Sequence, residues 1–174
     1  MNVFYKTYKL NSKDSLHSWC KNAGVFPTND KLFGKKLIRL DDATLAKHQN
    51  TLASWPVSKP ENSLGGEPFT LQTTVCFSKS RSSKDVKRKF SALSKEEALV
   101  KFCSMTGLEK VYEKDSSYVN VTPVRGIFIH GVEDKNVFHI TGTFRVVDED
   151  KFINAYNQGV GRRKSYGCGL IVVL

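Results

Sequence analysis

The chain has 174 residues, which allows one domain or two small ones, and its 40% hydrophobic content is enough for an ordinary packed core. Lysine and arginine total 27 against 17 acidic residues, a net charge of +10, which favours a polyanionic partner, nucleic acid before membrane. No apolar run approaches the roughly 18 residues of a membrane helix, and plain solubility is the alternative explanation of the charge.

The N-terminal segment predicts a strand followed by an amphipathic helix. Residues 2–10 alternate apolar and polar side chains, as a half-buried strand does. The helix is expected between Ser12, a capping residue, and Gly24, which ends it. Its apolar residues recur at helical spacing on one face: Leu16, Trp19, Cys20 and Ala23.

A second strand, a second helix and a linker are expected next. Residues 31–40 predict a strand or a short hairpin with Gly34-Lys35 at its turn. Residues 41–53 open with two acids that can cap a helix. Residues 59–67 combine Pro, Asn, Ser and a Gly-Gly pair, a composition typical of a linker.

The pattern then restarts. Ser94 and Glu97 form a capping box before an apolar helix. The other expected elements are strands at 68–78, 118–130 and 136–147, a helix at 148–158, and a terminal strand at 169–174.

The second part therefore has the order β-α-β-β-α-β, and the first part is a shortened version of it. This order is typical of ferredoxin-like or RRM-like domains. The sequence predicts an α+β protein of two tandem ferredoxin-like (RRM-like) domains, residues 1–64 and 65–174, the second containing a glycine-rich loop.

Two segments concentrate the positive charge. Residues 79–89 carry one acid and six cations: Lys79, Arg81, Lys84, Lys87, Arg88 and Lys89. Six cations this close could neutralise several phosphates of a nucleic acid, and a solvated linker is the alternative. No aromatic residues interleave this basic segment, so a duplex partner suits it better than single strands.

The second cluster, Arg162, Arg163 and Lys164, lies within the glycine-rich loop GVGRRKSYGCG, residues 159–169. Because this loop follows a helix and precedes a strand, it fits neither a dinucleotide-binding fingerprint nor a P-loop. Backbone N–H groups and three cations there suit an RNA backbone. A tight helix-to-strand connection is the alternative role of its glycines: Gly159, Gly161, Gly167 and Gly169.

His17 is the one candidate for catalysis. It flanks the apolar face of the first helix between Lys13 and Lys21, a cationic setting that lowers a histidine pKa. Such an imidazole suits RNA cleavage by the ribose 2′-OH, which requires no metal, and a surface histidine is the alternative. His139 shares a strand face with Thr141, Thr143 and Arg145, which would face either RNA or solvent.

No cofactor or metal site is expected. The four cysteines (Cys20, Cys76, Cys103 and Cys168) contain no CxxC pair, and no histidine stands at metal-ligand spacing from them. The N-terminus has no signal-peptide pattern, so we expect a cytoplasmic protein with reduced thiols and no membrane partner.

The last third of the chain resembles the CasE family, the CRISPR precursor-RNA endoribonucleases of type I-E systems. Residues 139–174 contain the pattern G-hydrophobic-G-x-x-[KR]-[SA]-x-G-x-G-L, matched by Gly159, Gly161, Lys164, Ser165, Gly167, Gly169 and Leu170. Residues 67–80 are similar to the strand that opens the family's second domain, and residues 12–20 resemble the helix that carries its catalytic histidine.

The resemblance implies two ferredoxin-like domains that bind the stem-loop of the CRISPR repeat RNA. It implies cleavage at the 3′ base of the stem, leaving a 2′,3′-cyclic phosphate and a 5′-OH, with His17 as general acid or base and the basic segment on the stem phosphates. The protein would then stay in the Cascade complex with the other subunits and, through them, target DNA. A non-catalytic RNA-hairpin-binding subunit is the alternative, and a nucleotide-binding protein a weaker one.

Overall fold

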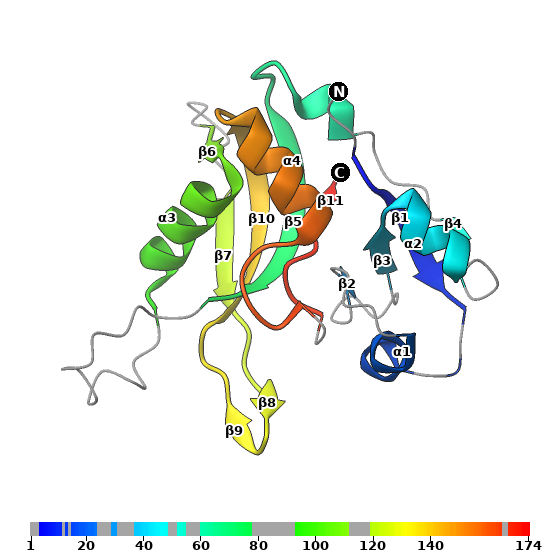
Figure 1. Ribbon diagram of the computed structural model, residues 1–174. Coiled ribbons are helices and arrows are strands. Elements are labelled where there is room, and N and C mark those ends of the chain that lie inside the picture. Colours follow the sequence, from blue (N-terminus) through cyan, green and yellow to red (C-terminus); the bar gives the residue numbers. More distant parts are fainter. Residues whose placement is uncertain are drawn as a thin grey trace.

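The computed structural model describes residues 4–11, 13, 15–23, 29–30, 37–48, 52–54, 60–77, 93–111, 119–164 and 167–174. Within these ranges the chain forms two principal antiparallel sheets and one small hairpin (Figure 1). The strands of the first sheet all precede those of the second in the sequence.

The first sheet has the strand order β2-β3-β1-β4, and its elements alternate as β-α-β-β-α-β. This is the ferredoxin-like order. The strands are β1 Lys6–Leu10, β2 Asn29–Asp30, β3 Leu37–Leu40 and β4 Leu52–Ser54, and the helices are α1 Leu16–Ala23 and α2 Asp42–Lys47. Apolar side chains of β1 and β3 enclose a small core with Trp19 and Cys20 of α1. Trp19 and Cys20 of the apolar face expected for the first helix are therefore buried, and the side chains of Leu16 and Ala23 lie outside the described part of the structure.

The second sheet has the order β11-β5-β10-β6, and β7 also pairs with β10. The same ferredoxin-like order is thus repeated on a larger scale, with β6 and β7 sharing the place of the second strand. The elements are β5 Phe69–Cys76, α3 Lys95–Thr106, β6 Leu108–Lys110, β7 Val119–Pro123, β10 Val137–Val146, α4 Glu149–Gln158 and β11 Val172–Val173.

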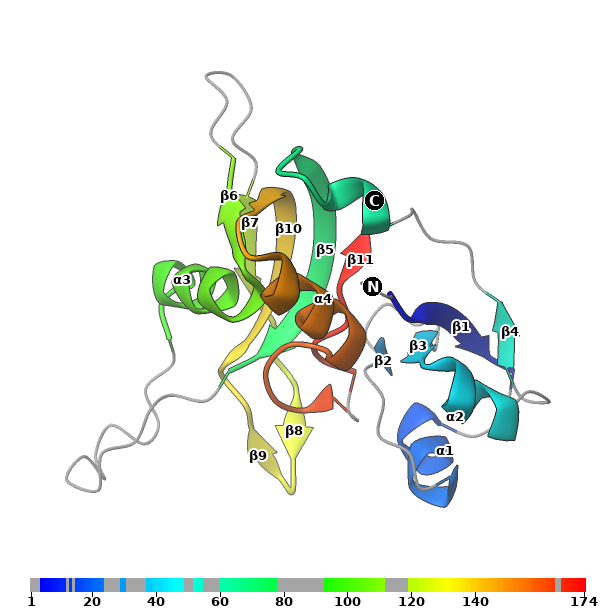
Figure 2. The same cartoon turned by 45° about the horizontal axis from the view of Figure 1, so that its top comes forward.

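Strand β10 organises the main core because its side chains alternate between two faces. Phe138, Ile140 and Phe144 are buried, and Phe144 packs edge-on against Phe102 of α3, with ring centroids 5.6 Å apart. Helices α3 and α4 cover this face of the sheet (Figure 2). The opposite face carries half-buried polar residues of β10, as the sequence predicts: His139, Thr141, Thr143 and Arg145.

A short hairpin, β8 Phe128–Ile129 and β9 Val132–Glu133, extends from the lower end of the second sheet (Figure 1). Phe128 and Val132 expose more than half of their surface there. Residues 118–130 are expected to form a single β-rich run, whereas the structure divides this stretch between β7 and the hairpin.

Two local predictions are wrong. The second helix ends at Lys47, and Leu52–Ser54 form β4 on β1 rather than more helix. The first helix is capped by Ser15, whose hydroxyl oxygen accepts from the Ser18 amide at 3.1 Å, three residues after the expected cap. The capping box of Ser94 and Glu97 is confirmed with both of its hydrogen bonds.

The α+β class with repeated ferredoxin-like topology is confirmed. The segment between the sheets includes a 3-10 helix, Pro60–Ser63, and Leu64 after it packs against the second core. We propose the domain boundary between residues 64 and 65, since the last strand of the first sheet ends at Ser54 and the second sheet begins at Phe69. In the described part of the chain, no helix is long and apolar enough to span a membrane.

Candidate nucleic-acid interface

The described residues of the glycine-rich loop, 159–164 and 167–169, run along the edge of β5. The Arg162 amide donates to the Cys76 carbonyl at 2.8 Å, and the Gly169 amide donates to the Thr74 carbonyl at 2.6 Å. Beyond Gly169, β11 pairs with Leu71 and Gln72 of the same strand. The loop is therefore held by the sheet through its backbone, which leaves its cationic side chains available for contacts of their own.

Two glycines of this loop are required by close backbone approach. Gly161 has φ +77°, and a Cβ there would lie 2.5 Å from the Cys76 carbonyl oxygen. Gly169 has φ +98°, and a Cβ there would overlap the backbone of Val160. Gly159 and Gly167 also have positive φ angles. These glycines thus serve the tight helix-to-strand connection considered in the sequence, whether or not they also contact a ligand.

The three cations of the loop differ in their surroundings. Arg162 is exposed, whereas Arg163 and Lys164 are half-buried. Arg163 adopts φ +61°, unusual for a residue with a side chain, and its Nε lies 3.4 Å from Oδ2 of Asp134. The contact with Asp134 helps to hold Arg163 in this unfavourable backbone conformation.

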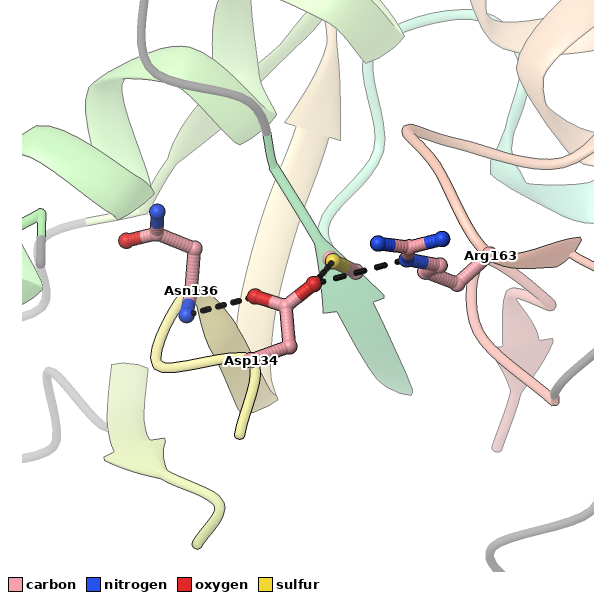
Figure 3. A network of polar contacts seen from close by, with 4 residues as sticks. Asp134, Asn136 and Arg163 are labelled. Carbon is pink, nitrogen blue, oxygen red and sulfur yellow. Dashed lines mark hydrogen bonds and ion pairs between the residues drawn. The ribbon is translucent and has the colours of Figure 1, made fainter. Parts of the chain in front are cut away.

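Asp134 connects the loop to the sheet (Figure 3). Its Oδ1 accepts from the Asn136 amide at 3.0 Å, and its Oδ2 accepts from Cys76 Sγ at 3.2 Å as well as from Arg163. Burial raises the pKa of Asp134, but these hydrogen bonds and the charge of Arg163 together hold it below its usual value. Burial, followed by the contact with Asp134, raises the pKa of Cys76 to about 12, so this thiol stays protonated and donates.

Asp134 and Cys76 were not predicted as part of this site. An Asp followed two residues later by Asn is a sequence signal for a local turn in which the carboxylate accepts from the backbone, and the structure has this turn. No sequence signal indicates that Asp134 contacts Arg163, which lies 29 residues after it in the chain.

His17 lies on helix α1, and the conformation of its side chain is outside the described part of the structure. The basic segment also lies outside the described residues: Lys79, Arg81, Lys84, Lys87, Arg88 and Lys89. In both views helix α1, the glycine-rich loop and the β8–β9 hairpin lie towards the lower end of the molecule (Figures 1 and 2). The roles of His17 and the basic segment remain predictions.

The polar face of the second sheet is a further surface. Oγ1 of Thr74 lies 3.1 Å from Nδ1 of His139, and burial lowers the pKa of His139. Among the described residues, no group of three or more His, Cys, Asp or Glu side chains is placed to hold a metal ion.

Two ferredoxin-like sheets and a cationic loop beside β5 define a tandem ferredoxin-like protein with a surface suited to a polyanion. A family model described as CRISPR associated protein matches residues 131–174, the segment that contains the glycine-rich loop. The family resemblance noted in the sequence thus agrees with an independent match over this segment. The curated protein sequences contain no match to the chain.

Solved structures with a similar fold cover nearly the whole chain. Cse3 of Thermus thermophilus bound to an RNA representing a pre-cleavage complex matches with a TM-score of 0.59, 12% identity and 100% of both chains covered. The CRISPR endoribonuclease Cse3 bound to 19 nt RNA gives a TM-score of 0.59 and 14% identity over 98% of both chains. The CRISPR-associated protein Cas6e of Escherichia coli K-12 gives 0.54 and 14% over 98% of both chains. The chain shares the fold of these proteins.

Proposed function

We propose that this protein is a metal-independent endoribonuclease that binds the stem-loop of a CRISPR repeat RNA and cleaves the precursor RNA at the 3′ base of the stem. The observation that carries the proposal is the full-length similarity in fold to CRISPR endoribonucleases, two of them solved with RNA, combined with the family match over the glycine-rich loop. The net charge of +10 supports a nucleic-acid partner independently.

The proposed chemistry is an intramolecular transfer at phosphorus. The ribose 2′-OH loses its proton and O2′ attacks the adjacent phosphorus, while the bond to O5′ breaks and O5′ takes up a proton. The products are a 2′,3′-cyclic phosphate and a 5′-OH, and no water is consumed. His17 acts as the general base towards the 2′-OH or as the general acid towards O5′.

Cations assist this reaction because negative charge accumulates on the phosphate oxygens in the transition state. Arg162 and Lys164 of the glycine-rich loop are suited to contact these oxygens, while Arg163 is held by Asp134. The six cations of the basic segment would bind the phosphates of the stem and account for most of the affinity. After cleavage the protein would remain on its product as a subunit of the Cascade complex.

The test uses the purified full chain and its own repeat RNA in EDTA, with products resolved on a gel. We expect cleavage by the wild type, and none when the scissile nucleotide carries a 2′-deoxy sugar. His17→Gln should lose cleavage while keeping RNA affinity. His48→Gln is the control within the same unit: His48 is the C-cap of helix α2, and its ring packs edge-on against Trp19 of α1, 5.5 Å between centroids. This variant should cleave at the wild-type rate.

Tight binding without cleavage by the wild type would overturn the enzyme proposal and favour the alternative, a non-catalytic subunit that holds the RNA hairpin. Cleavage that survives His17→Gln would instead remove His17 from the mechanism while leaving the activity in place.

A further inference from the structure

Arg39 is a buried arginine in a strand whose other residues are apolar. It lies in β3, within the sequence LIRL, and exposes 1% of its surface. Burying a guanidinium is costly unless its N–H groups find acceptors. Burial lowers the pKa of Arg39 to about 10, while Tyr156 acts to raise it, so the side chain is charged at neutral pH.

The acceptors of Arg39 lie on both sheets. Within the first sheet, Nε and Nη2 donate to Oγ1 of Thr7 on the neighbouring strand, at 3.3 and 3.2 Å. On the second, Nη1 donates to the Tyr156 carbonyl and Nη2 donates to the Ile171 carbonyl, each at 2.9 Å. One side chain thus joins the two ferredoxin-like units through charge-assisted hydrogen bonds.

The two carbonyls on the second sheet flank the glycine-rich loop. Tyr156 is in the last turn of α4, three residues before Gly159, and Ile171 follows Gly169 by two residues. Helix α4 and strand β11 are the elements of the second sheet nearest to β3 in both views (Figures 1 and 2). Arg39 therefore holds the two ends of the loop together and attaches both to the first sheet.

Neighbouring contacts tie the same part of α4 to the residues just before strand β1. The Tyr5 amide donates to Oδ1 of Asn157 at 2.8 Å, and the ring of Phe4 packs edge-on against that of Tyr156, with centroids 5.1 Å apart. A hydrogen bond and an aromatic contact thus reinforce the attachment that Arg39 makes to α4.

We propose that Arg39 is a positioning residue for RNA cleavage, which fixes the glycine-rich loop relative to helix α1 of the first sheet. The proposal rests on the proposed function, because it assumes that the loop and His17 of α1 act on one phosphate. The two groups come from different sheets, so their separation depends on how the sheets are joined. An error of about 1 Å between reacting groups can cost on the order of 100-fold in rate.

Arg39→Lys and Arg39→Met test this proposal. A lysine keeps the charge, but its single ammonium lacks the planar fork that donates to both carbonyls at once, and methionine keeps only the apolar stem. We expect the single-turnover cleavage rate of both variants at saturating protein to fall by roughly 10- to 100-fold. The Kd for the repeat RNA should change by less than about threefold, because the stem phosphates are bound elsewhere.

Lys151→Met is the control. Lys151 is an exposed cation of α4 whose Nζ donates to the Ser104 carbonyl of α3 at 3.1 Å, a charge-assisted contact within the second unit alone. This variant should cleave at the wild-type rate. A normal rate in Arg39→Lys and Arg39→Met, or a loss confined to Kd, would overturn the proposal.

Hydrogen exchange gives a readout that does not depend on cleavage. In the Arg39 variants the amides of Arg162 and Gly169 should exchange faster, while that of Val124, which donates to Val137 within the second sheet, should not. If the wild type does not cleave the RNA, the proposed function is wrong. Hydrogen exchange would still show whether Arg39 holds the loop.

If both Arg39 variants fail to fold, amide hydrogen exchange in the wild type tests the proposal instead. If Arg39 holds the loop to the first sheet, amides of β3 and of the loop open together and share one dependence on denaturant. Loop amides that exchange by a separate, denaturant-independent opening would overturn the proposal.

Discussion

The guanidinium carbon of Arg39 lies 3.6 Å from the centroid of the Tyr156 ring, and the same tyrosine accepts a hydrogen bond from Arg39 through its carbonyl oxygen. One residue of α4 thus offers this cation both a π face and a carbonyl. The ring also fills the space between the two sheets, since Tyr156 is 1% exposed and belongs to the core of the second sheet.

Replacing Tyr156 should separate these roles. Tyr156→Phe keeps the ring and the carbonyl and removes only the hydroxyl, which interacts with the side chains of Thr7 and Arg39, so we expect a loss of about 1 kcal/mol in the free energy of unfolding. Tyr156→Leu also removes the ring beneath Arg39 and should cost about 2–4 kcal/mol. Urea denaturation followed by fluorescence measures both, and equal losses in the two variants would contradict this division.

The glycine-rich loop should be sensitive to a single methyl group. Gly161→Ala places a Cβ against the Cys76 carbonyl in addition to the strain of a positive φ, and should cost more than about 2 kcal/mol in unfolding free energy. Gly131→Ala is the control, because Gly131 has the same φ of +77° with no atom within 4 Å of its added Cβ. Similar losses in the two variants would show that φ strain alone, and not the approach to β5, sets the cost.

The Asp134 network predicts a pH-dependent contribution to stability. The folded-state pKa of Asp134 lies below its unfolded value, so the stability it provides is present above about pH 3.9 and is lost as the pH falls through the folded pKa. Asp134→Asn should therefore be less stable than the wild type at pH 7, by about 1 kcal/mol, and the difference should vanish in acid. Urea titrations at pH 7 and pH 3 test this. A difference that persists unchanged at pH 3 would rule out the charge as its source.

Salt dependence tests the basic segment. Arg88→Gln with Lys89→Gln should lower the slope of log K against log salt for repeat RNA by about 1.5 to 2, because each cation on a phosphate displaces about one counterion. Lys101→Gln with Lys151→Gln, on helices α3 and α4, serves as the control of equal charge and should leave the slope unchanged. Equal slopes for both pairs would place the RNA away from the basic segment.

Much of the fold could be predicted because local patterns agree with it. The alternation of apolar and polar residues along β10 and the capping box at Ser94 are short-range signals, and both are confirmed. Strand β4 was missed because three residues, Leu52–Ser54, are too few to show a period, and their pairing with β1 is non-local.

The candidate site was predicted only in part, for a related reason. The glycine-rich loop has a distinctive composition, whereas Arg39 is a lone arginine in an apolar strand whose carbonyl acceptors lie 117 and 132 residues away. Asp134 likewise depends on a partner in another segment. A sequence pattern shows which residues are unusual, but tertiary pairing decides what they contact. The roles of His17 and of the basic segment remain predictions.

The contacts of Arg39 with residues far along the chain also constrain the order in which the two units can assemble. Strands β1 to β4 lie within residues 6–54 and can pair as soon as that stretch leaves the ribosome, whereas the carbonyl of Ile171 is made more than a hundred residues later. Until Tyr156 is made, the guanidinium has no acceptor from the second unit, and it stays in water. Docking of the two units is therefore a late event in synthesis, and a chain stalled before α4 would present an unburied charge where the finished protein buries Arg39.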